Sequence, residues 1–547
     1  MLARFILVAL LLVLPAGARA QGTPSPADWR DVPIYQVFTD RFFDGDPSNN
    51  NLEGSYDPGN ASGDFSTWYP GNVHGGDFAG IMEKLDYIQA LGFRAVWISP
   101  VQLNYNGAHH GYHAINFQAI APHFGTEQEL RALADALHAR GMYLILDVVC
   151  NHTADLITSV SPGYPNFQNP GTYVLSWRNA TRPPPPFNNL AWYHNNGEIQ
   201  NYVDPDQILG ELAGLDDLRT ENASVRAALI DAFNWLIDVS DCDGFRIDTV
   251  KHTELGFWQA WAPAVRSHAA SIGKSNFFLY GEVFDGSDTN NGRFTGTKAG
   301  GPFALDSVLY FPMLFTMQGV FGFGAPTSDL TARYSYLGEY DPVAQPRLLH
   351  FLDNHDVARF LSFGVANQDA TKLNAALGFI TTTRGIPLVY QGTEQAFDGG
   401  GDPYDREDMW DGEWEYGPSH GDNFNMTHPQ YIVLRRLMEA RAAYPALRTG
   451  GFTELVNSGG SGVYGYLRTG PEDVLVVVNT ATSSRTTGNL PTNWTSGTVV
   501  SDLLDAERRK TLDAANREEQ TRLTGLHGGG TKSELLDFAQ AIAHGPK

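Results

Sequence analysis

Four segments of the chain share one construction, a short apolar run that ends in carboxylates, amides or imidazoles. The most informative is Asp243–His252, DGFRIDTVKH, in which apolar residues as far as Val250 indicate a buried β-strand. Alternate residues of a strand share a face, so Arg246 and Asp248 should point the same way, which would keep Asp248 ionised. An Arg/Asp pair on one strand is more often a plain ion pair than part of a catalytic site. This segment alone therefore does not establish catalysis.

The other three segments are Asp147–His152, Gly281–Phe284 and Phe351–Asp356. Each follows an apolar run of strand length. Polar groups gathered at the carboxyl ends of several parallel strands are how a (β/α)8 barrel builds its active site. The sequence therefore predicts an α/β protein with a TIM barrel.

Strand and helix patterns alternate along the chain as such a barrel requires. Expected helices include Asp77–Leu91, stopped by Gly92, and one that opens with the capping box of Thr126 and Glu129. The eight expected strands lie at Ile34–Phe38, Ala95–Ile98, Tyr143–Val149, the start of Asp243–His252, and near 277–281, 305–310, 348–352 and 387–390. The sixth of these strands has the weakest pattern.

Two regions break the alternation. Residues 151–216, after the third strand, are rich in Pro, Asn, Gly and aromatic residues and are too long for an ordinary barrel loop. We expect an inserted subdomain there, which leaves residues 21–150 and 217–444 for the barrel. From residue 445 to 547, short strands with Gly turns predict a C-terminal all-β domain. Its charged tail looks partly helical, for example over Ser533–Ala543.

The four segments, in this order, resemble the alpha-amylase family, glycoside hydrolase family 13, over nearly the full length. The motifs are most similar to those of extracellular bacterial alpha-amylases and cyclodextrin glucanotransferases. The resemblance implies Asp248 as nucleophile, Glu282 as general acid/base and Asp356 as a third carboxylate that grips the sugar's hydroxyls. The substrate-binding residues that it implies are Tyr112, His110, His152, Arg246, Lys251, His252, Phe284, His355, Asp402 and Arg406.

A retaining glycosidase needs two carboxyl groups about 5 to 5.5 Å apart, one to attack the anomeric carbon and one to protonate the departing oxygen. Asp248 and Glu282, on adjacent strands, are expected to supply that spacing. We also expect Arg246 to hold Asp248 charged while apolar neighbours keep the pKa of Glu282 raised. The implied reaction is hydrolysis of α-1,4 bonds in starch or maltooligosaccharides.

The resemblance also implies two calcium sites. The Asp- and Asn-rich loop after the first strand could be solvated or could bind a hard cation, on composition alone. Similarity to cyclodextrin glucanotransferases favours calcium, with ligands among Asp44, Asp46, Asn49, Asn50, Gly75 and Asp77. The second site would join the insert to the barrel through Asn151, Asp217 and the backbone carbonyls of Ile208 and His252.

Residues 1–20 have the layout of a cleavable secretory signal, with Arg4, an apolar run to Leu14 and a small-residue cleavage site. No later segment is long and apolar enough to span a bilayer, so we expect a secreted protein without a membrane anchor. The formal net charge of −24 argues against nucleic acid and anionic membranes as partners and suits a neutral glucan. A monomer is expected.

The two cysteines are predicted to be free thiols. Cys150 follows the carboxyl end of one expected strand, and Cys242 precedes the amino end of the next. In parallel strands these ends lie on opposite sides of the sheet, farther apart than the roughly 7 Å between Cα atoms that a disulfide tolerates.

Two alternatives to a hydrolase stay open. A cyclodextrin glucanotransferase or other transglycosylase would share the calcium loop and Phe284. Such enzymes have an aromatic residue four positions before the insert's calcium-binding Asp, where this chain has Ala213, and they usually continue through further β-domains. A non-catalytic glucan-binding barrel would typically lack the carboxylates that are present here and carry a membrane anchor.

Overall fold

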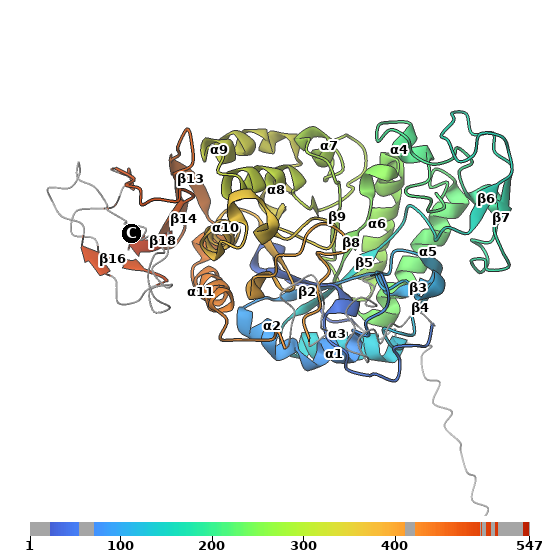
Figure 1. The fold of residues 1–547 in the computed structure, drawn as a ribbon, viewed down its shortest axis with the longest axis horizontal. Coiled ribbons are helices and arrows are strands. Elements are labelled where there is room, and N and C mark those ends of the chain that lie inside the picture. The colour runs from blue at the N-terminus through green and yellow to red at the C-terminus, as the bar shows by residue number, and fades with distance from the viewer. Residues whose placement is uncertain are drawn as a thin grey trace, which may run out of the picture.

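A computed structural model describes residues 22–53, 71–410, 422–488, 490–492, 494, 499–504, 509–511 and 540–545. The expected secretory signal lies outside the described residues. Eight parallel strands form a sheet with the spatial order β10-β9-β8-β5-β2-β1-β12-β11. Figure 1 labels β2, β5, β8 and β9 at the centre of the molecule. A parallel bridge between Leu309 and Leu349 joins the two ends of this sheet. The predicted (β/α)8 barrel is confirmed.

The barrel strands are β1 (Ile34–Val37), β2 (Ala95–Ile98), β5 (Tyr143–Val148), β8 (Gly244–Ile247), β9 (Phe278–Gly281), β10 (Ser307–Val308), β11 (Leu349–His350) and β12 (Ile386–Tyr390). A hairpin of β3 (Gln102–Asn104) and β4 (Ala114–Ile120) follows β2. The helices around the barrel are α1 (Phe78–Glu83), α2 (Leu85–Leu91), α3 (Glu127–Ala139), α5 (Ala223–Ser240), α6 (Leu255–Ser271), α7 (Asp288–Gly292), α8 (Phe311–Met317), α9 (Ser328–Tyr334), α10 (Ala370–Thr382) and α11 (Pro429–Ala443).

Within the barrel, two elements differ in form from the sequence-based prediction. Strand β8 ends at Ile247, and Val250 lies in a 3-10 turn, because Thr249 adopts a left-handed conformation with φ of 47° that breaks the extended chain. The helix expected over Asp77–Leu91 is two helices that meet at Lys84, whose ψ of 8° is not helical. The predicted capping box of α3 is confirmed.

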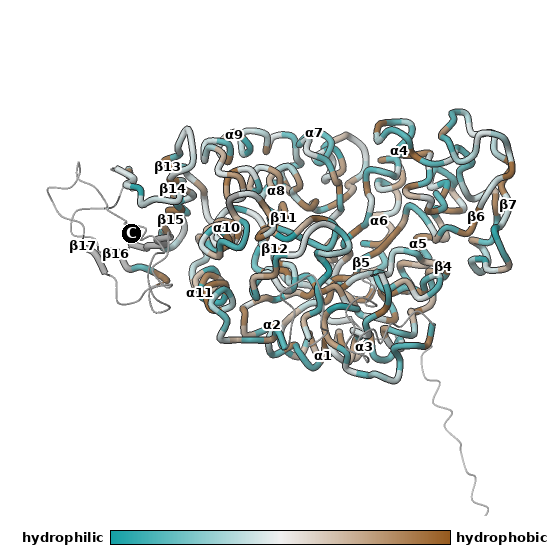
Figure 2. Tube along the Cα trace, in the orientation of Figure 1, coloured by the Kyte–Doolittle hydropathy of each residue, from teal (hydrophilic) through white to brown (hydrophobic). Residues whose placement is uncertain are grey.

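Alternate residues of the barrel strands point to two separate cores. One set fills the barrel interior. Trp29 covers this interior at the amino ends of the strands, where it stacks on Phe278 with the ring centroids 4.8 Å apart. The other set packs against the surrounding helices. Hydrophobic residues therefore run through the centre of the molecule while its outer loops are mostly hydrophilic (Figure 2). The polar residues at the strand ends thus stand on a rigid base.

The predicted insert contains a two-stranded sheet of β6 (Ile157–Ser159) and β7 (Leu175–Trp177) and the short helix α4 (Asp206–Leu209). Its end returns to the barrel through backbone hydrogen bonds, from Thr153 N to Asp216 O at 3.0 Å and from Leu218 N to Asn151 O at 2.8 Å. The sheet lies at the end of the molecule opposite the C-terminal strands (Figure 1).

The C-terminal region is a six-stranded sheet with the order β13-β14-β15-β18-β16-β17. The predicted helix over Ser533–Ala543 is wrong for its last residues, because Gln540–Gly545 form a strand, β18, that pairs with β15; residues 533–539 lie outside the described residues. The valine-rich β15 offers backbone hydrogen bonds that outweigh local helix propensity. The strands are β13 (Gly451–Val456), β14 (Val463–Thr469), β15 (Asp473–Asn479), β16 (Val499–Asp502), β17 (Arg509–Thr511) and β18.

Helix α10 joins this sheet to the barrel. All of its residues from Lys372 to Thr382 are buried, because one side packs on the barrel and the other faces the sheet. Polar contacts reinforce the junction: Arg468 donates to the carbonyl oxygen of Thr382 at 2.6 Å, and the hydroxyl groups of Thr382 and Tyr466 are 2.6 Å apart. The sheet thus covers an apolar helix.

Both cysteines, Cys150 and Cys242, are buried and free, which confirms the predicted thiols. Among the described residues, none of the helices has the length and apolar character needed to cross a membrane.

Candidate active site

The guanidinium of Arg246 lies buried among four carboxylates at the carboxyl end of β8. Its Nη1 donates to Asp248 Oδ1 at 2.7 Å and to the two oxygens of Asp147 at 2.9 and 3.0 Å. Its Nη2 lies 3.2 Å from Glu282 Oε2 and 4.0 Å from Asp356 Oδ2. The predicted shared face of Arg246 and Asp248 is confirmed. One cation is therefore shared by all three candidate catalytic carboxylates.

The register of β8 and β9 places Asp248 beside Glu282. Ile247 pairs with Gly281, so the two carboxylate residues follow their strands at the same level. Glu282 N donates to Ile247 O at 2.8 Å, and the backbone N–H of Thr249 donates to Glu282 Oε2 at 3.0 Å. The left-handed turn at Thr249 thus aims a backbone donor at the second carboxylate.

Burial acts on both of these carboxyl groups. It raises the pKa of Asp248 to about 7, although Arg246 lowers it, and the negative charge of Glu282 raises it further. Burial also raises the pKa of Glu282, against the same lowering effect of Arg246. We expected Arg246 to keep the pKa of Asp248 low, and this is wrong because burial outweighs the effect of the guanidinium; the expected raised pKa of Glu282 is confirmed. Such a pair can hold a single proton between its members.

A chain of hydrogen bonds connects this cluster to a neutral histidine. Tyr112 Oη donates to Asp147 Oδ2 at 2.9 Å and lies 2.6 Å from His355 Nε2, with the two rings stacked. The amide nitrogen of Gln36 lies 2.7 Å from His355 Nδ1. Burial lowers the pKa of His355 well below its usual value, so the ring is neutral and carries its proton on Nε2. That N–H also lies 3.2 Å from Asp356 Oδ2.

The remaining predicted substrate ligands lie around this core. His110 stacks on Tyr112 with the centroids 5.7 Å apart, and His152 Nε2 lies 3.3 Å from the carbonyl oxygen of Tyr112. Burial lowers the pKa of His152 to about 3, so it too is neutral. In the loop after β12, Arg406 Nη2 lies 3.1 Å from Asp402 Oδ1 and 3.5 Å from Asp356 Oδ1.

Another group of side chains lies on the side of the site that faces the insert. Lys251 Nζ donates to the carbonyl oxygen of Phe284 at 2.8 Å, and the ring of Phe284, 41% exposed, packs on Phe311. Tyr202 of the insert is 56% exposed, and its ring lies 5.9 Å from Lys251 Nζ and 6.1 Å from the ring of His252. The sequence did not single out Tyr202. Its position depends on the fold of the insert, which has no periodic pattern.

Asp147 is the more important residue that sequence reasoning did not assign to the site. Its carboxylate accepts hydrogen bonds from Arg246, Tyr112 and, at 3.1 Å, Trp97 Nε1, and it is fully buried. Burial raises its pKa to about 7 while Arg246 lowers it. One signal was available, because Asp147 opens one of the four polar segments and pairs directly with Arg246 across β5 and β8.

The loop after β1 brings together the residues expected at the first calcium site. Three of its buried oxygens, Asp44 Oδ1, Asn49 Oδ1 and Asn50 Oδ1, have no hydrogen-bond partner among the described residues. The amide groups of Asn49 and Asn50 donate to Asp77 and Asp44 at 2.9 and 2.7 Å, which turns their oxygens away. Burial raises the pKa of Asp44 to about 6. This oxygen-rich donor set fits calcium.

Two of the expected ligands at this first loop are constrained differently. The carboxylate of Asp77 already accepts from four N–H groups, those of Gly45, Asp46, Gly80 and the Asn49 side chain, so it caps α1 and holds the loop. Gly75 has a φ of 110°, and a Cβ there would lie 2.7 Å from the Asn50 amide.

The second set of expected ligands lies where the insert returns to the barrel, because Leu218 N donates to Asn151 O at 2.8 Å and His152 forms a β-bridge with Asp217. Asp217 Oδ2 lies 2.7 Å from His194 Nδ1, and Asn151 Oδ1 accepts from Thr253 at 3.2 Å. His252 Nδ1 lies 3.0 Å from the carbonyl oxygen of Gln207, the neighbour of Ile208 in α4. Burial raises the pKa of Asp217 to about 6. Insert and barrel thus meet at a buried, oxygen-rich point that fits the same ion.

A (β/α)8 barrel with paired carboxyl groups on adjacent strand ends, a third carboxylate opposite and neutral imidazoles around them has the groups of a carbohydrate-active enzyme. The comparison with known proteins identifies the family. Residues 36–413 match the family model described as alpha amylase, catalytic domain. The chain belongs to the alpha-amylase family.

Individual relatives include both hydrolases and transferases. The chain is 35% identical to a beta/alpha-amylase of Paenibacillus polymyxa over 89% of its own length and 37% of that protein. It is 30% identical to an alpha-amylase of Streptomyces lividans, over 75% of this chain and 52% of that protein. A cyclomaltodextrin glucanotransferase of Niallia circulans is 32% identical over 89% of this chain and 67% of the relative. The chain therefore spans about half or less of the first two relatives.

Solved structures give the same two groups. An Anoxybacillus alpha-amylase superposes with a TM-score of 0.75 at 28% identity, covering 95% of this chain and 99% of that one. The cyclomaltodextrin glucanotransferase CldA, which has a three-domain ABC distribution, gives 0.74 at 29% identity, with 94% and 99% covered. A cyclomaltodextrin glucanotransferase can therefore have three domains, so the number of β-domains does not discriminate between the two groups.

Proposed function

We propose that the chain is a retaining glycoside hydrolase of the alpha-amylase type that cleaves α-1,4 bonds in starch or maltooligosaccharides. The observation that carries the proposal is the bridging of Asp248 and Glu282 by the two terminal nitrogens of Arg246, at 2.7 and 3.2 Å. A single guanidinium between the carboxylates favours the close spacing of a retaining site over the wider spacing that admits a water molecule.

The chemistry follows from the protonation of that pair. One proton shared by the two carboxyl groups allows Asp248 to be ionised when Glu282 is protonated. Asp248 would attack the anomeric carbon while Glu282 gives its proton to the departing oxygen. Glu282, now ionised, would take a proton from a water molecule, which releases the sugar from Asp248 with retained configuration. Asp356 and the neutral His355 N–H would hold sugar hydroxyls during both steps.

The balance between hydrolysis and transglycosylation depends on which acceptor enters. At the position where ring-forming transferases have an aromatic residue, Ala213 is exposed and has a φ of 52°. Its methyl group offers a glucan little surface on which to wind, which supports hydrolysis. The exposed ring of Phe284 favours sugar acceptors, so a transglycosylase is the second candidate.

A time course on soluble starch, with the wild type beside Asp248→Asn, tests this proposal. Chromatography should separate linear from cyclic products while reducing ends are counted. Linear maltooligosaccharides and rising reducing ends from the wild type alone are expected. Cyclic products with few new reducing ends would mean a cyclodextrin glucanotransferase, and equal activity of the variant would remove Asp248 as nucleophile.

We further propose that the protein is secreted and contains two structural calcium ions. The proposal of secretion rests on the signal pattern of residues 1–20. The unpartnered oxygens of Asp44, Asn49 and Asn50 support the first ion, and the backbone contacts that hold Asn151 next to Leu218 and His152 next to Asp217 support the second. At the second site calcium would hold the insert against the barrel. Elemental analysis that finds no calcium, together with folding that is insensitive to chelators, would contradict it.

A further inference from the structure

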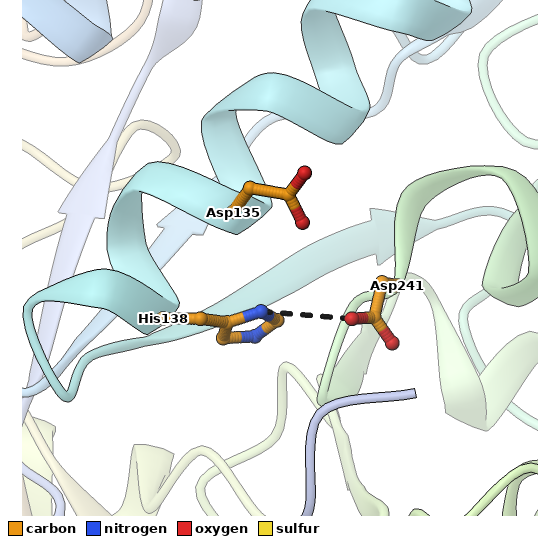
Figure 3. A group of neighbouring side chains, drawn as sticks. All are labelled: Asp135, His138 and Asp241. Carbon is orange, nitrogen blue, oxygen red and sulfur yellow. Dashed lines mark ion pairs between the residues drawn. The ribbon is translucent and has the colours of Figure 1, made fainter. Parts of the chain in front are cut away.

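A second group of metal-ligand side chains lies at the opposite end of the barrel from the active site. Asp135 and His138 are three residues apart on α3 and so share a face of that helix, and Asp241 precedes β8 (Figure 3). One ligand atom from each lies within 4.8 Å of the others. Asp248 follows the same strand at its carboxyl end, so the group is separated from catalysis by the length of β8.

A contact between the Nε2 atom of His138 and the carboxylate of Asp243 fixes the orientation of the imidazole ring. Its side chain is 7% exposed, and its Nε2 lies 2.8 Å from Oδ2 of the fully buried Asp243. Asp243 Oδ1 accepts from Lys274 at 2.8 Å, so this carboxylate is an acceptor that places the imidazole proton on Nε2. A carboxylate behind the distal nitrogen of a histidine is the usual support of a metal-binding imidazole.

The other nitrogen of His138 faces a carboxylate without a hydrogen bond. Nδ1 is buried, has no hydrogen-bond partner among the described residues, and lies 3.6 Å from Asp241 Oδ2. A divalent ion between the two atoms would bind both of them.

The distances fit a small tetrahedral ion. Zinc holds nitrogen and carboxylate oxygen at about 2.0 to 2.2 Å, which puts neighbouring ligand atoms of a tetrahedron roughly 3.3 to 3.6 Å apart. The 3.6 Å between His138 Nδ1 and Asp241 Oδ2 matches this value. Asp135, whose side chain is 60% exposed, can move the small remaining distance. We propose that Asp135, His138 and Asp241 bind a zinc-type divalent ion, with water as the fourth ligand.

Two cations already touch this group, and they differ in their effect. Lys274 lies 2.9 Å from Asp241 Oδ1, and Oδ2 accepts from the backbone N–H of Thr23 at 3.2 Å but has a further lone pair for a metal. Arg131 lies 3.1 Å from Asp135 and 3.5 Å from Asp241 Oδ2, in the place that the ion would take, and its side chain is 38% exposed. Arg131 therefore competes with the ion and can swing into solvent when the ion binds.

The test is Zn²⁺ binding to the full chain with calcium in excess, measured by calorimetric titration, with Co²⁺ absorption as a readout of tetrahedral geometry. We expect one Zn²⁺ per chain outside the calcium sites. His138→Gln should weaken it by at least about tenfold, and Arg131→Gln should tighten it. His268→Gln, which removes the imidazole of another His–Asp pair, at 2.8 Å from Asp238, is the matched control and should change nothing. Starch hydrolysis should be unchanged in all three variants.

Two results of the Zn²⁺ titrations would contradict the proposed site. Absence of Zn²⁺ binding by both the wild type and Arg131→Gln would overturn it, and so would equal affinities of wild type and His138→Gln. Because Arg131→Gln leaves all three ligands in place, its tighter binding would support the site even if His138→Gln did not fold.

Discussion

The guanidinium of Arg246 has two roles: it supplies a positive charge, and its two terminal nitrogens form a fork that contacts Asp248 and Glu282. Two substitutions of Arg246 separate these roles. In Arg246→Met, Asp147, Asp248 and Glu282 lose the one cation that pairs with them among the described residues, and removal of one partner of a buried ion pair costs about 3 to 5 kcal/mol. We expect the transition state to lose an interaction of the same size, so at 1.36 kcal/mol per factor of ten kcat/KM should fall by roughly two to four orders of magnitude. Arg246 lowers the pKa of Asp248, so that pKa should rise in the variant. Because the nucleophile must be ionised, the acid limb of the pH profile should move to higher pH.

Arg246→Lys keeps the charge and loses the fork. One ammonium cannot reach both Asp248 and Glu282, so one of the two charged contacts is lost, and a contact to a charged group is worth about 1.5 to 3 kcal/mol. We expect a rate about 10- to 100-fold below wild type with the acid limb closer to that of the wild type than in Arg246→Met.

The assay for both variants is the pH dependence of kcat/KM on a chromogenic maltooligosaccharide. Arg406→Met, which removes the contacts with Asp402 and Asp356, is the matched control and should raise KM without moving the acid limb. An acid limb in Arg246→Met that stays in place or moves to lower pH would refute the reasoning.

Four further predictions concern single features. Glu282→Gln should lower the rate on maltooligosaccharides by about 10² to 10⁴, yet mass spectrometry should detect a glycosyl-enzyme formed from maltosyl fluoride, whose leaving group needs no proton; failure to trap it would reject Glu282 as the acid. Asp147→Asn presents one acceptor oxygen to several donors, so kcat should fall about 10- to 100-fold and the unfolding temperature should drop; near-normal values would show that Asp147 is dispensable. Gly75→Ala should reduce the rise in unfolding temperature that calcium produces, measured against a chelated sample, and an undiminished rise would place the ion elsewhere. Cys150 and Cys242 should react with a thiol reagent only after denaturation, giving two thiols per chain; reaction in the native state would contradict their burial.

The barrel was predictable from sequence because its signals are local. Strand β2 (Ala95–Ile98) has the predicted bounds, and the capping box of Thr126 and Glu129 is formed as expected. Boundaries failed where a backbone conformation has no side-chain signature, as at Thr249 and Lys84. The prediction for Gln540–Gly545 failed for another reason. This strand forms by pairing with β15, which lies more than sixty residues earlier in the chain.

The residues of the candidate site could be predicted from sequence, but the pKa values of its carboxyl groups could not. Residue spacing indicates that Arg246 lies near Asp248, and the structure confirms this. The sharing of the same guanidinium with Glu282 and Asp147 depends on three strands meeting in register, which no single segment records. The pKa of Asp248 therefore could not be judged from its neighbours in sequence alone.

Helix α10 determines how freely parts of this molecule could be exchanged. Since its residues from Lys372 to Thr382 are buried between the barrel and the C-terminal sheet, the sheet is not a detachable module. A version shortened before β13 would expose the apolar surface of α10. It would also lose Tyr464 and Tyr466, whose rings cover Phe379. A fusion of this barrel to another protein should therefore keep the C-terminal sheet together with the barrel and join the new protein after the sheet.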